Sequence, residues 1–229
     1  MNYDDMGMLL EARAFAYHAM HAIFGMEPSE DSLKVYQEGV FSDLGAILDD
    51  EGFEDASSAM IDLEQAARFA ADVDMLVSAY TLMLIGPGEL PASPWESTYR
   101  SNERVLFQES TLDVRKAYVS QGLIPAGYPH VADDHISIEC DFLAKMGDRI
   151  SEAYGMKDGL KLAEHAKTSK IFLDKHLLTW VGRFRNGLCA CDVPSRNPAG
   201  TFYVRAATAL AQFAAADSVL LERLPRMTA

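Results

Sequence analysis

The 229-residue sequence has few of the features that mark a secreted or membrane-spanning protein. It contains only three cysteines, so we expect no disulfide framework and predict reduced thiols. No run approaches the roughly 18 consecutive apolar residues of a membrane span, and the first residues are acidic, whereas a signal peptide begins with basic ones. These absences predict a cytoplasmic protein.

Basic residues are also scarce. Thirty-four Asp and Glu against 20 Lys and Arg give a formal charge of −14. This charge disfavours non-specific binding to nucleic acid or to anionic membranes, because both require a positively charged protein surface. It is compatible with a basic partner, although an acidic surface also serves solubility alone.

The sequence motifs of common enzyme classes are missing. There is no Gly-x-x-x-x-Gly-Lys-Ser/Thr loop, no Gly-x-Gly-x-x-Gly turn and no serine-hydrolase nucleophile elbow. His135 and Glu139 have the helical spacing of a metal-ligand pair, but the Glu-x-x-His repeat of di-iron bundles does not occur, and Cys189-Ala190-Cys191 lacks the gap of a zinc site. We expect neither an enzyme nor a cofactor; a metal-dependent helical-bundle enzyme is the alternative with least support.

Runs that alternate apolar and polar residues, as half-buried strands do, are absent, and no internal repeat is visible. Apolar residues instead recur at helical spacing along most of the chain. The pattern predicts helices over about 5–24, 58–85, 112–121, 133–150, 159–186 and 199–224, with shorter segments at 33–38, 41–48 and from 93. The predicted fold is all-α, a helical bundle of about 8–10 helices.

Proline and glycine suggest how these helices are grouped. We predict an N-terminal lobe over 1–122, including a proline-rich loop at 86–110, a hinge linker at 123–132, and a C-terminal lobe over 133–229. Two helical halves joined by a flexible linker can exchange one half between protomers. A monomer and a domain-swapped homodimer are therefore both compatible with the sequence.

The segment 132–146 carries the most information about function. It follows a link that contains proline and glycine, and Asp133 or Asp134 is predicted to cap the helix that begins there. One face of this helix is apolar and predicted to be core. The adjacent face combines ionisable and apolar side chains; its members are His135, Glu139, Phe142 and Met146.

Three patches occur in a characteristic order and separation. The first runs from Tyr80 to Gly88 and on through Pro91-Ala92-Ser93-Pro94-Trp95-Glu96-Ser97-Thr98-Tyr99; the second is Asp134-His135-Ile136 with Glu139 and Phe142-Leu143; the third is Phe172, His176-Leu177, Trp180, Phe184 and Phe202-Tyr203. Together they resemble the TorD/DmsD family of cytoplasmic chaperones for molybdenum-containing oxidoreductases. The resemblance covers about residues 75–225.

The resemblance implies a non-catalytic, all-helical chaperone. Its partners would be the twin-arginine signal peptide and the apo form of a molybdopterin-containing oxidoreductase subunit, whose export it would delay until the cofactor is inserted. The alternative is a structural adaptor that docks on a folded oxidoreductase subunit without recognising the signal peptide.

A receptor for such a peptide needs carboxylates beside an apolar wall, because arginine forms two-pronged hydrogen bonds with carboxylates and stacks on aromatic rings. The candidate peptide-binding residues are Asp133, Asp134, His135, Glu139, Phe142, Trp95, Glu96, Tyr99 and Tyr128. We expect Asp134, His135 and Glu139 to form the polar end of the groove. Structural alternatives are a backbone hydrogen bond for His135 and core packing for Trp95 and Tyr99.

Overall fold

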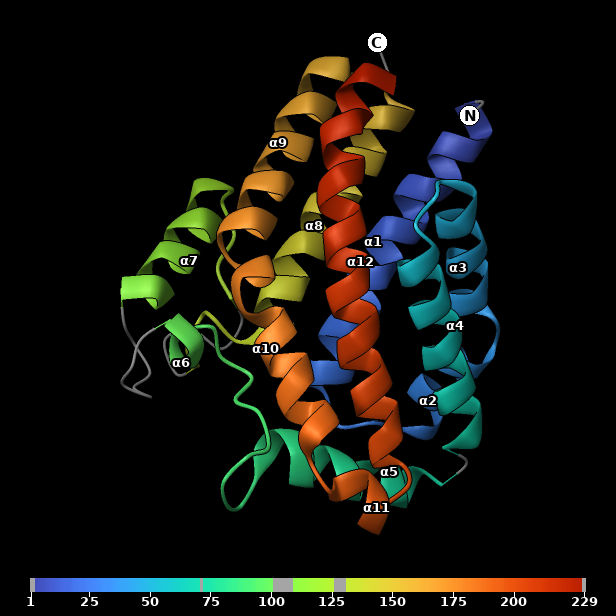
Figure 1. Ribbon diagram of the computed structural model, residues 1–229. Coiled ribbons are helices and arrows are strands. Elements are labelled where there is room, and N and C mark those ends of the chain that lie inside the picture. Colours follow the sequence, from blue (N-terminus) through green and yellow to red (C-terminus); the bar gives the residue numbers. More distant parts are fainter. Residues whose placement is uncertain (1–2, 71, 101–108, 126–130, 228–229) are drawn as a thin grey trace. The chain divides into compact units, whose positions relative to one another are not determined.

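The computed structural model describes residues 3–70, 72–100, 109–125 and 131–227, and these residues form helices and connecting turns (Figure 1). The elements are α1 (Tyr3–Gly25), α2 (Glu30–Gln37), α3 (Val40–Asp50), α4 (Glu54–Phe69), α5 (Val73–Tyr80), the π-helical turn η1 (Thr81–Ile85), α6 (Ser97–Arg100), α7 (Glu109–Ser120), α8 (Ile136–Gly155), α9 (Gly159–Lys175), α10 (Leu177–Ala190), α11 (Val193–Arg196) and α12 (Gly200–Met227). Within these ranges the only β-type pairing is an isolated bridge between Trp95 and His135. The predicted all-α fold is confirmed.

The chain divides into two compact units that interleave in sequence. The first unit comprises Met1–Ala22, Trp95–Trp180 and Ala214–Ala229, and the second comprises Ile23–Pro94 and Val181–Phe213. The division falls inside α1, α10 and α12, so each of these helices contributes residues to both units. The lobes predicted on either side of residues 123–132 remain a prediction, and residues 126–130 of that linker lie outside the described residues.

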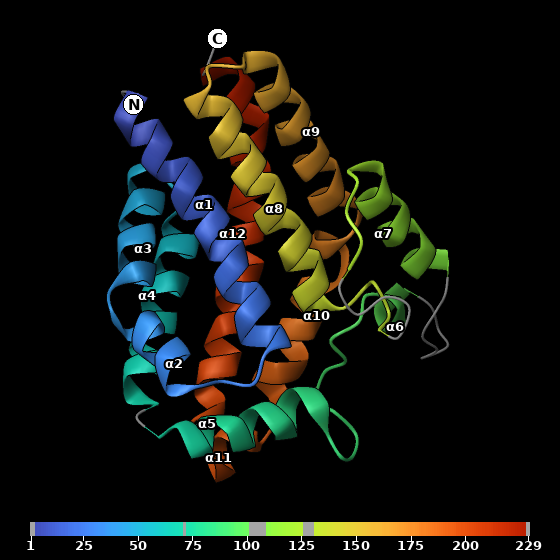
Figure 2. The ribbon, with the colours of Figure 1, turned by 180° about the vertical axis from the view of Figure 1, so that it is seen from behind.

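In the first unit α8 and α9 lie side by side, as both ribbon views show (Figures 1 and 2). Arg13 of α1 donates to the Asp217 carboxylate of α12 at 2.6 Å, and the Tyr17 hydroxyl donates to the same carboxylate at 2.9 Å. Close packing of α1 against α8 requires Gly147, since a Cβ there would lie 2.9 Å from that of Ala14. These contacts fix the helices that carry the candidate site.

In the second unit α3 and α4 pack side by side (Figure 2). Tyr36 of α2 stacks on Phe202 of α12 with ring centroids 5.9 Å apart. The Asn197 side chain donates to the Met75 carbonyl at 2.8 Å and so ties the segment before α12 to α5. Apolar rings and one buried amide therefore connect elements distant in sequence.

The helix predicted over 58–85 is interrupted. α4 ends at Phe69 and α5 begins at Val73, because the Asp72 carboxylate accepts hydrogen bonds from the backbone N–H groups of Asp74 and Met75 and caps a new helix. At its other end α4 begins at Glu54, with Phe53 as the preceding cap residue. α4 therefore starts four residues before the predicted start at residue 58, and the acidic residues 49–55 are divided between the end of α3, a turn at 51–53 and the start of α4.

The helix predicted over 159–186 is also two helices. His176 interrupts it with a backbone conformation (φ −118°, ψ −91°) outside the helical region, and α10 then continues past Gly187 to Ala190. The short helix predicted from Ser93 is α6, which begins later, at Ser97. At both places a side chain contacts a residue far away in the sequence. His176 Nδ1 lies 3.1 Å from the Glu96 carboxylate, and the Asp134 carboxylate accepts from the Ser97 N–H at 2.7 Å.

Helix α12 is, among the described residues, the one helix long and apolar enough to cross a membrane by length and composition. Its window Gly200–Leu224 has a mean hydropathy of 1.2, and 61% of that window is buried within the protein. This burial is that of a core helix.

Candidate functional site

The residue that caps the start of α8 is His135, not one of the aspartates before it. His135 has an extended backbone, and its Nδ1 accepts a hydrogen bond from the Ser137 N–H at 3.2 Å, so it is the N-cap residue. The predicted capping role of Asp133 and Asp134 is therefore wrong. The Asp134 carboxylate instead accepts from the Ser97 N–H at 2.7 Å and from the Thr111 hydroxyl at 3.1 Å, which ties the starts of α6 and α7 to α8.

Four carboxylates of the first unit form what we call the acid cluster: Glu96, Asp133, Asp134 and Glu139, each with 0% of its surface exposed. Glu96 accepts from Arg100 Nη1 at 2.7 Å, and its other oxygen lies 3.1 Å from His176 Nδ1. Arg115 Nε donates to Asp133 Oδ2 at 2.5 Å, and Trp180 Nε1 donates to Glu139 Oε2 at 3.3 Å. The acid cluster is thus an internal polar network.

The acid cluster is not fully satisfied. Within the described part of the chain, Asp133 Oδ1 and Glu139 Oε1 are buried without a hydrogen-bond partner. Burial raises the pKa of Glu139 well above its usual value, and the charge of Glu96 adds to the shift. Burial likewise raises the pKa of Tyr118, and the charges of all four cluster carboxylates add to this shift. All four therefore lie close enough to the Tyr118 hydroxyl to influence it.

The predicted aromatic residues surround this network. The Trp95 ring meets the His135 ring edge-on at 5.1 Å, and Tyr99 stacks on Trp180 at 5.4 Å. Phe142 is 3% exposed and packs on Phe172 at 4.5 Å. Tyr128 lies outside the described residues.

Eight of the nine predicted residues therefore belong to the first unit and gather around the start of α8. On the predicted face of α8, Glu139, Phe142 and Met146 are buried and His135 is partly buried. A period of 3.6 residues identifies which side chains share a face, but the neighbours that cover the face come from other parts of the chain. A peptide-binding role for these residues remains a prediction.

An open pocket lies next to the acid cluster, in the same unit. Its volume is about 190 Å³, and its lining residues come from the end of α7, the following turn and one face of α8: Tyr118, Leu123, Ile124, Pro125, Ile138, Asp141, Phe142 and Lys145. Asp141 on its rim pairs with Lys145. Tyr118 connects the pocket to the acid cluster, since its ring lies 5.1 Å from that of Phe142 and its hydroxyl donates to the Asp133 carbonyl at 3.0 Å.

Only Phe142 of this lining was among the predicted site residues. The sequence does contain a signal for the α8 part, because Ile138, Asp141, Phe142 and Lys145 recur at i, i+3, i+4 and i+7. Ile124 is 72% exposed and lines the pocket, so its side chain is available for an apolar contact there. Nothing in the spacing could associate Ile124 with α8.

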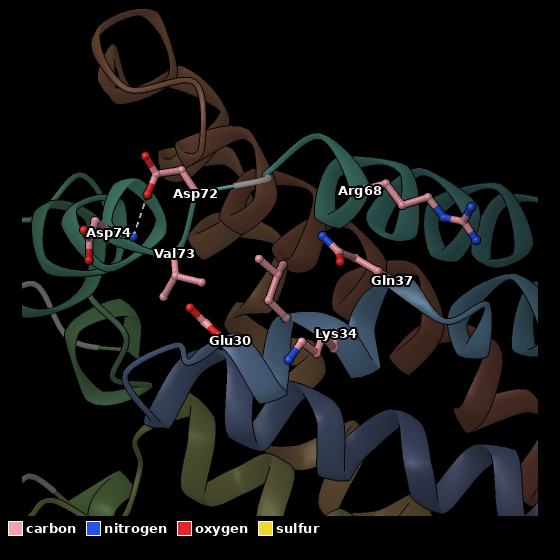
Figure 3. Close-up of a pocket in the computed structure, with 8 residues that line it drawn as sticks. Glu30, Lys34, Gln37, Arg68, Asp72, Val73 and Asp74 are labelled. Atoms are coloured by element: carbon pink, nitrogen blue, oxygen red, sulfur yellow. Dashed lines mark hydrogen bonds between the residues drawn. The ribbon is translucent and has the colours of Figure 1, made fainter.

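A larger hollow of about 830 Å³ lies in the second unit, between α2 and the α4–α5 corner (Figure 3). Its lining is mainly polar, and the carboxylates of Glu30, Asp72 and Asp74 lie around Val73, while the Arg68 guanidinium extends away from them (Figure 3). Asp72 caps α5, and Arg68 is bonded to Glu64 at 2.6 Å. These polar groups already serve the helices that carry them, and the hollow lacks the aromatic floor of the α8 pocket.

Groups of three or more His, Cys, Asp or Glu side chains placed to hold a metal ion do not occur in the described ranges. The three cysteines are not joined in disulfides, and Cys140 is buried.

Comparison with known proteins adds a family. The model of the nitrate reductase delta subunit family matches residues 49–186, more than half of the chain. The chaperone protein TorD of Vibrio atlanticus is 24% identical over 176 residues, which are 76% of this chain and 80% of that protein. A probable Tat proofreading chaperone DmsD of Haemophilus influenzae is 28% identical over 109 residues, 48% of this chain and 46% of that protein.

Among solved structures, a putative redox enzyme maturation protein from Archaeoglobus fulgidus is 20% identical and aligns with 72% of this chain and 91% of its own. The TM-score is 0.36, too low to support a conclusion about fold or function.

Proposed function

The chain belongs to the nitrate reductase delta subunit family, together with TorD and DmsD chaperones, and from this premise we propose that it binds the twin-arginine signal peptide of a redox enzyme subunit. Its role is that of a redox enzyme maturation chaperone, not of an enzyme. The client we propose is the apo form of a molybdopterin-containing oxidoreductase subunit, held in the cytoplasm until its cofactor is inserted. We call the arginine-bearing signal peptide the leader.

The observation that supports this proposal best is the pocket on α8. A leader presents guanidinium groups followed by an apolar segment, so its receptor needs apolar surface directly beside carboxylates. Ile124, Ile138 and Phe142 supply the apolar surface, and Asp141 stands on the rim. The acid cluster begins on the other side of Tyr118.

The α8 pocket and the acid cluster would bind different parts of the leader. The apolar segment of the leader would enter the pocket, where each aliphatic side chain removed from water contributes about 1.5–3 kcal/mol. The cationic part would lie toward Asp141 and the acid cluster, where partial exclusion of water strengthens arginine–carboxylate hydrogen bonds. The predicted residues Trp95 and Tyr99 are partly buried near the same cluster and offer ring faces to a guanidinium.

Calorimetry with a synthetic leader tests the proposal. The peptide carries two consecutive arginines followed by an apolar segment of leucine and alanine. Because Ile124 is mostly exposed, Ile124→Ser should leave the fold intact and weaken leader binding about tenfold, the equivalent of one lost aliphatic contact. Leu160→Ser is the matched control, since Leu160 is 87% exposed on α9 and does not line the pocket.

The adaptor alternative predicts a different result. A protein that recognises only a folded oxidoreductase subunit would give no heat of binding with the leader alone. Equal affinities of the parent and the Ile124→Ser protein would instead place leader binding elsewhere on the chain.

A further inference from the structure

Arg100 and Arg115 pair with carboxylates of the acid cluster and remain partly exposed to solvent, unlike the buried Arg13. The Arg13 side chain, bonded to Asp217, is only 2% exposed, so that pair is closed to solvent. Arg115 and Arg100 are 30% and 35% exposed, whereas the carboxylates they contact, Asp133 and Glu96, are fully buried. Each of these carboxylates is thus reached by a guanidinium that remains partly in water.

One oxygen of the Asp133 carboxylate has no hydrogen-bond partner among the described residues. A carboxylate and a guanidinium can form two parallel hydrogen bonds, but Asp133 accepts from Arg115 Nε through Oδ2, while its Oδ1 has no partner among the described residues. Glu64 in the second unit is a useful contrast, because one of its oxygens accepts from Arg68 and the other from the Ser42 N–H. Both oxygens of Glu64 are used, and only one of Asp133.

The two covered carboxylates meet at one corner of the first unit. The Glu96 N–H donates to the carbonyl of Asp134, the residue next to Asp133, at 3.0 Å. The Asp133 carbonyl in turn accepts from the Tyr118 hydroxyl, and the Tyr118 ring lines the α8 pocket. A peptide whose apolar part fills this pocket would therefore place its cationic end beside Asp133 and Glu96.

We propose that Arg115 and Arg100 occupy two guanidinium subsites that the two arginines of the leader take over when it binds. This inference rests on the proposed function, since it assigns the subsites of the same leader. Exchanging one guanidinium for another preserves the charge balance of a buried carboxylate, which is costly to leave unpaired. A lysine is a poor substitute, because its ammonium cannot form the two-pronged bond.

The first test does not depend on the leader. Arg115→Ala leaves Asp133 without its guanidinium, so N-methylguanidinium at low millimolar concentration should bind the variant and raise its melting temperature by a few degrees. Methylammonium should have no such effect. Arg196→Ala is the control, since Arg196 and its partner Asp192 are 66% and 73% exposed and leave no buried carboxylate behind.

The second test uses the synthetic leader. Because the leader no longer has to displace a side chain, Arg115→Ala should bind it about tenfold more tightly than the parent does, and N-methylguanidinium should compete with it. Where Arg115→Ala does not fold, Arg100→Ala carries the same test, because Arg100 lies more exposed and only one helical turn from Glu96.

The outcomes separate the two proposals. Unchanged or weaker leader binding by the arginine variants overturns the subsite exchange and leaves leader binding standing. A rise in melting temperature with methylammonium equal to that with N-methylguanidinium also overturns it, since the site then has no preference for guanidinium. Failure of the parent and of both variants to bind the leader overturns the proposed function, and the exchange with it.

Discussion

His135 caps the start of α8, meets the ring of Trp95 edge-on and remains uncharged at neutral pH. Its burial lowers the pKa from 6.5 to about 4; the nearby Asp134 charge opposes this shift and His21 reinforces it. The neutral ring is the form that accepts the Ser137 N–H through Nδ1. The helix cap therefore depends on the charge state of a histidine.

This dependence predicts how stability changes with pH. The unfolded chain binds a proton at His135 below about pH 6.5, whereas the folded protein binds it only near pH 4, so stability should fall as the pH decreases through that window. The expected loss from this residue is about 3 kcal/mol once the pH has fallen below 4. Urea unfolding of the parent and of His135→Asn at several pH values measures it, because asparagine still caps the helix but does not titrate. Parallel pH profiles of the two proteins would contradict the assignment.

Glu139 predicts the opposite dependence. Its pKa is raised by burial, so the folded protein keeps a proton that the unfolded chain loses above about pH 4.5, and this group makes the protein less stable as the pH rises. Glu139→Gln keeps the acceptor for Trp180 Nε1 and removes the titration. The variant should gain stability relative to the parent between acidic and mildly alkaline pH, as measured by urea unfolding. A constant difference across this range would show that Glu139 is ionised in the folded protein.

At the scale of helices, one aspartate decides whether residues 54–85 form one helix or two. The apolar period continues through the break, which is why the sequence predicts a single helix. Asp72 interrupts it by supplying a side-chain acceptor to two backbone N–H groups. Asp72→Ala should therefore destabilise the protein by about 1 kcal/mol in urea unfolding. Asp74→Ala is the control, because Asp74 lies in the same first turn of α5 but the capping hydrogen bonds go to the Asp72 side chain; equal losses would exclude the capping role.

Two glycines of α10 offer a matched comparison of packing. A Cβ at Gly187 would lie 2.8 Å from that of Ala92 and 3.0 Å from the Pro91 carbonyl oxygen, whereas a Cβ at Gly182 would meet nothing within 4 Å. Gly182→Ala should stabilise the protein by about 0.5–1 kcal/mol, because alanine favours the helix. Gly187→Ala should destabilise it, since the proline-rich segment must move. Thermal unfolding of both variants decides the point, and a stabilised Gly187→Ala would show that this segment is not held against α10.

Two helix ends that the sequence predicts correctly are marked by glycine. α1 stops at Gly25, and α7 is followed by Gly122, whose φ of +70° suits glycine. Glu96 and Arg100, four residues apart in the sequence, also form an ion pair at 2.7 Å, as their spacing favours. The errors occur at Asp72, His135 and His176, where a side chain competes with helix propagation or capping through contacts that periodicity does not contain.

At the scale of the whole molecule, the family and the all-helical fold can be predicted because the motif patches, their order and the helical period are all visible in a single sequence. The burial of the acid cluster cannot be predicted in this way. Asp133 and Glu96 look accessible in the sequence, and they are buried because Arg115, His176 and Tyr118 approach from other helices. The structure shows a pocket on α8 beside a covered acid cluster, and the groove predicted around Asp134, His135 and Glu139 stays a prediction.

The account depends on recognition of guanidinium by a protein with a formal charge of −14. The most direct measurement is calorimetry of the parent with two leaders that differ only in having two arginines or two lysines. The account predicts binding of the arginine leader that weakens with added salt, and about tenfold weaker binding of the lysine leader at equal charge. Equal affinity for the two leaders, or binding of neither, would contradict it.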